Sequence, residues 1–301
     1  MNERKMMIVI LAILVLLNIG LFGYGLYQRS VRDWIPEERV DQIRQIYAQA
    51  GIPLEAEIDR DNRPAAFLEL AEADLDSMAE EFLGDSFDKS YIYGTQVQYS
   101  SENIQIMIDR KTHTMTYTDS SPAIGDSWQR SLTRDNGAGQ GEAQLSEEEE
   151  ELALLPAAAA FAQQWLGEQI YKVESERQRE GFYFLFYQRQ EDRLYSFNQV
   201  QVWVTPDGVA KAKITCWEVK GETKEEYHLT PADEILYALL KTMQAEVSEE
   251  GLAVKEILRG YELETDGETQ RGIPSLTVVL SNGAWYPMNC ISLAEDGVQT
   301  N

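Results

Sequence analysis

The side chains that most often do chemistry are few and widely spaced in this 301-residue chain. Its imidazoles are His113 and His228, and its thiols are Cys216 and Cys290. Nucleophilic catalysis needs a base beside the nucleophile, and a zinc site needs several ligands at short, fixed spacing. Neither pattern occurs, so we interpret the histidines as surface or capping residues and the cysteines as buried small residues, for which a disulfide is possible but not implied. The sequence therefore predicts no enzyme, no metal site and no cofactor.

Three further patterns could do chemistry but are poorly formed. Asp59-x-Asp61 resembles the start of a calcium loop, but its sixth position is Pro64 and its twelfth is Leu70. A carboxylate pair suited to glycoside cleavage is expected by chance among 51 acidic residues, so such a pair predicts nothing. Aromatic side chains could line a sugar groove, although on strands they more often form the core. These aromatic residues are Trp165, Trp203, Trp217, Trp285 and Tyr286.

The segment 6–27 carries the most suggestive pattern for function. It holds no charge over 22 positions, and as a helix it would reach roughly 33 Å, enough to span a bilayer. A cleaved secretory signal is the alternative, but its apolar region is normally only about 7–15 residues long. The amide of Asn18 would lie in the middle of the membrane, where it can form a hydrogen bond to a neighbouring helix. The alternative is that a single asparagine is tolerated in the membrane without such a partner. The predicted partner-binding residues are Leu11, Leu14, Asn18, Gly20, Leu21, Gly23 and Gly25.

The charge balance limits the partners and suggests a side of the membrane. With 51 acidic and 26 basic residues the net charge is -25, which makes nucleic acids and anionic headgroups poor partners. Flanking cations are nearly balanced, with Arg4 and Lys5 on one side and Arg29 and Arg32 on the other. A long acidic region would sit badly against an anionic cytoplasmic leaflet. We expect a single-pass cell-membrane protein with a cytoplasmic N-terminus and an extracytoplasmic C-terminal region.

The elements that follow alternate between helices and antiparallel strands. Ser146 and Glu149 form a capping box that opens a helix, which Pro156 either kinks or starts later. Turn residues at 206–208 and at 282–283 predict two hairpins. Helices are expected from 36 to 50, 72 to 83, 146 to 166 and from 230. Strands are expected at 54–58, 91–100, 103–109, 112–119, 170–178, 181–190, 195–204, 209–220, 254–265, 275–280 and 284–293.

A glycine-rich stretch without large apolar residues is the best boundary in the chain. It divides the chain into a cytoplasmic tail 1–5, a transmembrane helix 6–27, a membrane-proximal α+β module 28–132, a linker 133–145 and a C-terminal α+β module 146–301. Helices followed by strands occur on both sides of this linker. We therefore expect an α+β fold, with an N-terminal transmembrane helix followed by two modules of antiparallel sheet with helices packed on one face.

Two groups of residues, one at each end of the chain, carry a family resemblance. The N-terminal group is Leu17-Asn18, Leu21, Leu26 and Tyr27. The C-terminal group is Lys255-Glu256-Ile257, Gly260-Tyr261, Ile273-Pro274, Asn282-Gly283, Tyr286 and Asn289. In both groups the chain resembles the YycI-type regulatory proteins of the essential Gram-positive cell-wall two-component system. Ser275-Leu276 stands where the family usually has a tryptophan. This departure is expected of a remote member with YycH/YycI-like, PepSY-like extracytoplasmic domains, or of a related PepSY-like domain with a different partner.

The resemblance implies a regulator rather than an enzyme. In such a protein the membrane helix, together with that of a YycH-like sister protein, contacts the transmembrane helices of a sensor histidine kinase and modulates kinase activity. Asn18 and the neighbouring glycines are the residues to which this role would carry over. Two other classes stay open: an anchored cell-wall hydrolase or carbohydrate-binding protein, and a PepSY-like protease inhibitor acting through the hairpin near 282–283.

Overall fold

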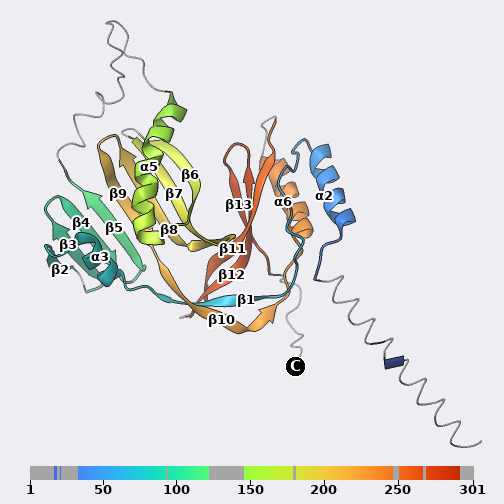
Figure 1. The fold of residues 1–301 in the computed structure, drawn as a ribbon, viewed down its shortest axis with the longest axis horizontal. Coiled ribbons are helices and arrows are strands. Elements are labelled where there is room, and N and C mark those ends of the chain that lie inside the picture. The colour runs from blue at the N-terminus through green and yellow to red at the C-terminus, as the bar shows by residue number, and fades with distance from the viewer. Residues whose placement is uncertain are drawn as a thin grey trace, which may run out of the picture. The chain divides into compact units, whose positions relative to one another are not determined.

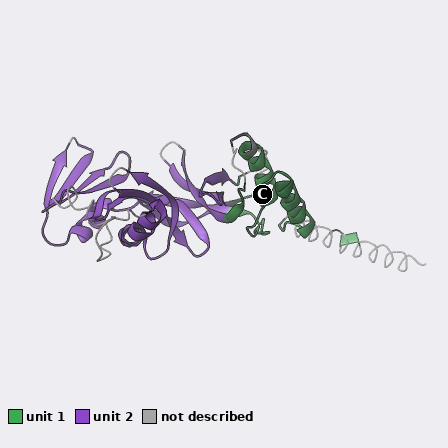
Figure 2. Cartoon of the chain, turned by 90° about the horizontal axis from the view of Figure 1, so that it is seen from above, with its two compact units in different colours: residues 1–65, 226–257, 290–301 green, residues 66–225, 258–289 purple. Residues whose placement is uncertain are grey.

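The computed structural model describes residues 17–18, 21, 33–92, 94–121, 146–178, 181–246, 251–266 and 269–291. The chain divides into two compact units: unit 1 comprises residues 1–65, 226–257 and 290–301, and unit 2 comprises 66–225 and 258–289 (Figure 2). The expected transmembrane helix 6–27 and the expected linker 133–145 lie outside the described residues, apart from 17, 18 and 21. Among the residues that are described, no helix has the length and apolar character needed to cross a membrane.

Unit 2 is built on a 13-stranded mixed sheet (Figure 1). The main path runs β10-β1-β12-β11-β8-β9-β5-β4-β3-β2, while β6 and β7 continue from β8, and β13 pairs with β12. The strands are β1 (Ala65–Glu72), β2 (Asp88–Ile92), β3 (Gln96–Ser101), β4 (Ile104–Asp109), β5 (Thr114–Asp119), β6 (Ile170–Gln178), β7 (Gly181–Gln190), β8 (Arg193–Thr205), β9 (Gly208–Thr215), β10 (Trp217–Tyr227), β11 (Val254–Asp266), β12 (Thr269–Leu280) and β13 (Trp285–Asn289).

The expected fold class, two separate modules of antiparallel sheet, is wrong. Strand β5 precedes the expected linker and β9 follows it, yet Met115 of β5 pairs with Ile214 of β9 in one sheet. The sheet is also not purely antiparallel, because β11 runs parallel to β8 with Gly260 opposite Leu194. Unpaired strand edges are costly, and joining the strands of both segments satisfies their backbone groups. Most of the described chain is therefore strand, with helices in a minority.

Two helices cover one face of this sheet. They are α3 (Leu75–Leu83) and α5 (Glu147–Leu166), and α5 lies across β7, β8 and β9 (Figure 1). The predicted capping box of α5 is confirmed, with Ser146 and Glu149 each bonding the other's backbone. Pro156 lies inside α5, which continues through it to Leu166. Phe161 and Trp165 of this helix share the main core with alternate residues of the strands beneath.

The hairpins predicted from turn residues are present, but some strands differ from the expectation. Strands β8 and β9 are joined at 206–207, and β12 and β13 at 281–284, as predicted. The single strand expected at 91–100 is instead a hairpin of β2 and β3. Strand β1 was not predicted from the sequence. It pairs with β12, where Leu68 lies opposite Gly272.

Unit 1 contains a pair of helices, α2 (Glu37–Gln49) and α6 (Ala232–Glu246), that pack against each other. The buried Tyr47 hydroxyl donates a hydrogen bond of 2.7 Å to the Leu236 carbonyl. Arg39 reaches across the pair to Asp233 at 2.6 Å and Glu234 at 2.9 Å. The strand expected at 54–58 is wrong, because that segment forms only an isolated bridge between Leu54 and Val254.

Candidate functional site

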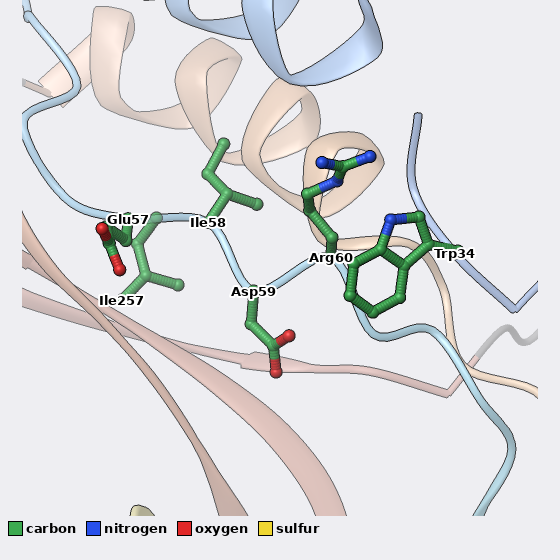
Figure 3. Close-up of a pocket in the computed structure, with 6 residues that line it drawn as sticks. All are labelled: Trp34, Glu57, Ile58, Asp59, Arg60 and Ile257. Atoms are coloured by element: carbon green, nitrogen blue, oxygen red, sulfur yellow. The ribbon is translucent and has the colours of Figure 1, made fainter. Parts of the chain in front are cut away.

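Unit 1 holds an open groove with a cavity volume of about 410 Å³. Its lining comes from three segments: the residues before α2, the irregular segment before β1, and the start of β11. Figure 3 shows Asp59 and Arg60 pointing in opposite directions from the same segment. The groove is lined by Trp34, Glu57, Ile58, Asp59, Arg60 and Ile257.

The groove presents an aromatic ring beside a held cation. Trp34 is 50% exposed, and the Arg60 guanidinium carbon lies 5.2 Å from its ring centroid. Arg60 is fixed in turn, because its Nε donates to the Ile35 carbonyl at 2.8 Å and its terminal nitrogen lies 3.6 Å from Glu37. A Trp ring with an adjacent guanidinium suits a boundary between apolar and polar surroundings. This pairing was not predicted from the sequence, since its partners are 26 residues apart.

The Asp59-x-Asp61 segment is organised by turns. Asp59 accepts the Asp61 amide at 2.9 Å, and Asp61 accepts the Arg63 amide at 3.0 Å, which are the local bonds typical of Asx turns. The Arg63 guanidinium also pairs with the Asp61 carboxylate at 2.5 Å. Among the residues that the structure describes, no group of three or more His, Cys, Asp or Glu side chains could hold a metal ion.

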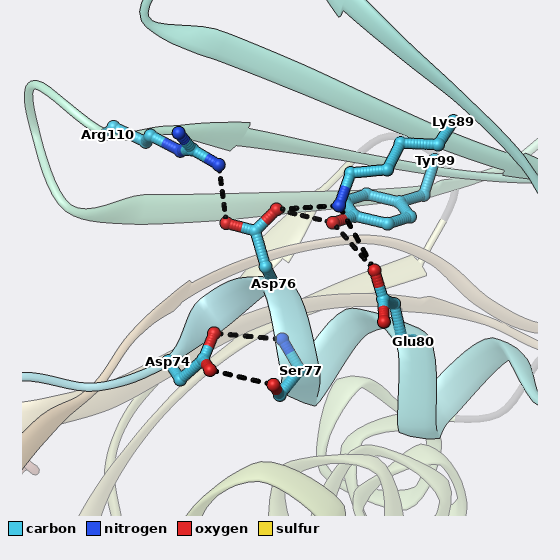
Figure 4. Close-up of polar contacts among 7 residues, drawn as sticks. All are labelled: Asp74, Asp76, Ser77, Glu80, Lys89, Tyr99 and Arg110. Carbon is cyan, nitrogen blue, oxygen red and sulfur yellow. Dashed lines mark hydrogen bonds and ion pairs between the residues drawn. The ribbon is translucent and has the colours of Figure 1, made fainter.

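Unit 2 carries a second polar cluster, where α3 meets β2, β3 and the turn after β4 (Figure 4). Asp74 caps α3 by accepting the Ser77 amide at 3.0 Å and the Ser77 hydroxyl at 2.7 Å. Two residues further on, Asp76 accepts hydrogen bonds from the Tyr99 hydroxyl and, at 2.9 Å, from the Arg110 guanidinium. Every group in this cluster has a partner, so its arrangement fixes α3 on the sheet.

The charges of this cluster are mutually satisfied. Lys89 lies 3.1 Å from Glu80 and 3.3 Å from Asp76, and its ammonium sits 4.7 Å from the Tyr99 ring centroid. Burial acts to raise the pKa of Asp76, but hydrogen bonds from Tyr99, Arg110 and Lys89 outweigh it and lower that pKa. These bonds and ion pairs stabilise the contact of α3 with the sheet.

Glu150 is the most deeply buried carboxylate among the described residues, at 1% exposure. Its Oε2 lies 2.8 Å from Arg177 of β6, while its Oε1 has no hydrogen-bond partner in the described part of the chain. The neighbouring Glu151 pairs with Lys172 of the same strand at 2.5 Å. Both ion pairs tie the first turns of α5 to the sheet, where carboxylates also favour the positive end of the helix dipole.

The imidazole and thiol side chains of unit 2 are packing groups. The surface or capping role expected for His113 is wrong, because His113 is buried. Its Nε2 bonds the Cys216 carbonyl at 2.7 Å, and its ring centroid lies 4.5 Å from that of Trp217. Burial raises the pKa of the Cys216 thiol to about 12, so it is almost entirely protonated and unreactive at neutral pH. Cys290 is also buried, so both cysteines are buried small residues as expected, and neither forms a disulfide, which the sequence had left open. His228 is exposed, in line with a surface residue.

Most of the predicted partner-binding residues lie outside the described residues, namely Leu11, Leu14, Gly20, Gly23 and Gly25. Asn18 and Leu21 are described and helical. Leu17 and Leu21 expose 55% and 63% of their surface. Helical spacing puts these two leucines on one side, so an apolar surface is left uncovered beside Asn18.

The aromatic residues considered for a sugar groove divide into two groups. Trp165 and Trp217 are buried in core clusters, as aromatics on such elements usually are. Trp285 packs against a third cluster around Tyr187, with ring centroids 5.7 Å apart. Trp203 and Tyr286 stay partly exposed. The five residues therefore do not form one groove.

No protein-family model matches the chain, and the search of curated proteins gives no match. Among solved structures, the chain is similar to an uncharacterized protein from Eubacterium rectale at 14% identity and a TM-score of 0.41, covering 82% of this chain and 85% of that one. It is also similar to the C-terminal domain of YpeB from Bacillus megaterium at 15% identity and a TM-score of 0.35, covering 75% and 95%.

Likenesses at such TM-scores carry no argument about function. The YycI resemblance itself stays a prediction.

Proposed function

We propose that this chain is a non-enzymatic regulator held at a cell membrane by residues 6–27, which modulates a sensor histidine kinase by contacting its membrane segments. The observation that carries the proposal is the exposed apolar pair Leu17 and Leu21 beside Asn18. Large apolar side chains exposed together mark a surface that another apolar phase or partner covers. Amide side chains in membrane helices also form hydrogen bonds across to neighbouring helices.

The groove of unit 1 is consistent with a position near the bilayer surface. Trp34 follows the uncharged segment by only seven residues, and Arg60 stacks over its ring. Tryptophan is enriched at membrane interfaces, where its ring meets the acyl boundary and its N–H meets polar headgroups. Arginine behaves similarly, with an apolar stem and a charged head. Trp34 and Arg60 of unit 1 would then lie at the bilayer surface.

Replacing residues 6–27 by an unrelated uncharged helix of equal length tests the proposal. We expect the chain to stay at the membrane but to lose co-purification with the kinase and its effect on kinase autophosphorylation. A finer variant, Asn18→Leu, should weaken both, while Asn18→Gln should retain both because the amide is kept. Unchanged kinase output and unchanged co-purification in the replaced chain would show that regulation does not run through this segment.

Two assays separate the alternatives. Incubation of the purified chain with cell-wall material should release no soluble fragments, whereas release would support the hydrolase. Titration against a panel of extracellular proteases should leave their activity unchanged, whereas inhibition lost on altering residues 282–283 would support the protease inhibitor. Release of wall fragments or inhibition of a protease would contradict the regulator as the main function, whereas binding of a glycan without cleavage would not.

A further inference from the structure

Part of the unit 2 sheet face that points away from α5 is exposed, although Leu185 and Tyr187 further along β7 on that face are buried in another cluster. Along β7, Phe182, Phe184 and Phe186 belong to the core cluster shared with α5. Successive side chains of a strand point to opposite faces, so Tyr183 lies on the other side. The same alternation applies to β9, where Ala212 is in that core and its neighbours are exposed.

Strand register places aromatic, amide and basic side chains next to one another on this face. Tyr183 of β7 is opposite Trp203 of β8, which is opposite Lys211 of β9. In the adjacent row Gln201 of β8 is opposite Lys213 of β9. We call these five residues the open sheet face. Its lysines are exposed and its other members are partly exposed.

The ring of Trp203 offers a flat apolar surface. The side chain is partly exposed, but its Nε1 atom is buried and has no hydrogen-bond partner among the described residues. The exposed part of the ring is therefore carbon. Beside it, burial and then the carboxylates of Glu174 and Glu176 raise the pKa of Tyr183 to about 12, so its hydroxyl keeps its proton and can donate.

The two lysines stand out in a chain with a net charge of -25. Neither Lys211 nor Lys213 makes an ion pair with any residue that the structure describes. Other lysines on strands of the sheet do make ion pairs, namely Lys89, Lys172 and Lys220. The lysines are also separated from the acidic side chains of β6, because strands β7 and β8 lie between β6 and β9. The open sheet face therefore has two cationic side chains on β9 next to the aromatic ring of Trp203 on β8.

We propose that the open sheet face binds an acidic glycan whose sugar rings carry carboxylates, with a ring stacked on Trp203 and its carboxylate on Lys211. Directly opposite residues on neighbouring strands have Cβ atoms only about 4.5–5.5 Å apart. A hexuronic acid carries its carboxylate on the sugar ring itself, so one residue of the glycan can make both contacts. The amide of Gln201 and Lys213 lie one row along, within reach of the next sugar.

Other ligands fit this arrangement less well. A neutral glycan would leave two unpaired ammonium groups without a counter-charge. A polymer linked by phosphodiesters puts its charge between the sugar units rather than on the ring that stacks. An acidic peptide would supply carboxylates but no flat ring face for Trp203. The acids Glu174 and Glu176 repel the carboxylates from the β6 side, so the charged edge of the glycan is directed to β9.

The test is binding of the full chain, in detergent micelles, to an oligogalacturonate, followed by calorimetry at low salt. We expect saturable binding that weakens as salt rises, because charges carry part of it. Lys211→Glu and Lys213→Glu should each weaken binding at least about tenfold. Both positions are exposed, so the thermal unfolding midpoint should not change. Trp203→Leu should weaken binding as well.

The matched control is Lys224→Glu on β10, which changes the net charge equally at an exposed residue outside this face. It should bind like the unaltered chain. In contrast, Glu174→Gln should strengthen binding by removing a repelling charge. Equal loss in the Lys224 variant, equal binding of neutral dextran, or binding of poly(glycerol phosphate) or polyglutamate in place of the uronate would each overturn the proposal. So would no binding of the oligogalacturonate.

Discussion

The hydroxyl of Tyr47 donates a hydrogen bond of 2.7 Å to the backbone carbonyl of Leu236, which joins two helices almost two hundred residues apart in sequence. Tyr47 is completely buried. Burial also raises the pKa of Tyr47 well above its usual range, so the hydroxyl keeps its proton. This bond and the Arg39 ion pairs hold the helix pair of unit 1 together.

Replacing Tyr47 with phenylalanine should lower the free energy of unfolding by about 1 kcal/mol, because it removes one buried hydrogen bond and keeps the ring. Denaturant unfolding measures this cost. The unaltered chain should also lose stability as the pH rises above about 10, where unfolded tyrosines release protons that the folded chain retains. Tyr47→Phe should make that loss less steep. An equal pH dependence in both chains would show that Tyr47 is not protected.

Asp76 should govern part of the stability at low pH. Burial acts to raise the pKa of Asp76, but its hydrogen bonds with Tyr99, Arg110 and Lys89 lower it on balance. Its contribution is therefore present above the unfolded pKa of about 4 and is lost as the pH falls through the folded value. Asp76→Asn should cost about 1–3 kcal/mol at neutral pH and flatten the acid limb of the stability curve.

The control for Asp76 is Asp85→Asn, at an exposed residue just beyond α3. This change should leave both neutral stability and the acid limb within experimental error. If Asp76→Asn and Asp85→Asn behaved alike, the cluster in Figure 4 would not be a stabilising network.

Gly260 is required by the parallel pairing of β11 with β8. A Cβ at Gly260 would lie 2.1 Å from the Leu194 carbonyl oxygen, far inside van der Waals contact. Gly260→Ala should therefore force the two strands apart and lower the free energy of unfolding by about 3 kcal/mol or more. At Gly272 the nearest atoms belong to side chains at 3.1 Å, so Gly272→Ala should cost less. Thermal melts measure both costs. A larger loss of stability in Gly272→Ala than in Gly260→Ala would contradict this strand pairing.

The thiols should be free but protected. Burial raises the pKa of Cys216 to about 12, and Cys290 is also buried. Iodoacetamide at pH 8 should leave both unmodified in the native chain and modify both after denaturation without a reductant. Mass spectrometry of the intact chain gives the count. If the two cysteines reacted with iodoacetamide in the denatured chain only after a reductant was added, they would form a disulfide and the prediction would be wrong.

Local signals in the sequence predicted local structure well. The capping box at Ser146 and the hairpins at 206–208 and 282–283 depend on neighbouring residues, and all three are present. Pairing between distant strands was not predicted, because propensity and alternation do not specify which edges meet. The pairing of β5 with β9 and the parallel pairing of β8 with β11 therefore changed the fold class.

The candidate sites follow the same division. From the composition we expected no cluster of catalytic side chains, and we chose the partner-binding segment from the spacing of its residues alone. Both stay predictions. The groove at Trp34 and the open sheet face depend on contacts between segments far apart in sequence. Of the five aromatics considered for a sugar groove, only strand register separates Trp203 from those in the core.

Photo-crosslinking in membranes that contain the kinase tests the central claim most directly. A crosslinking amino acid is placed in turn at Leu14, Asn18, Leu21 and, as a control outside this segment, at the exposed Leu152 of α5. The account predicts crosslinks to the membrane segments of the kinase from the first three positions and not from Leu152. Crosslinks to lipid alone, or equal crosslinking from all four positions, would contradict it.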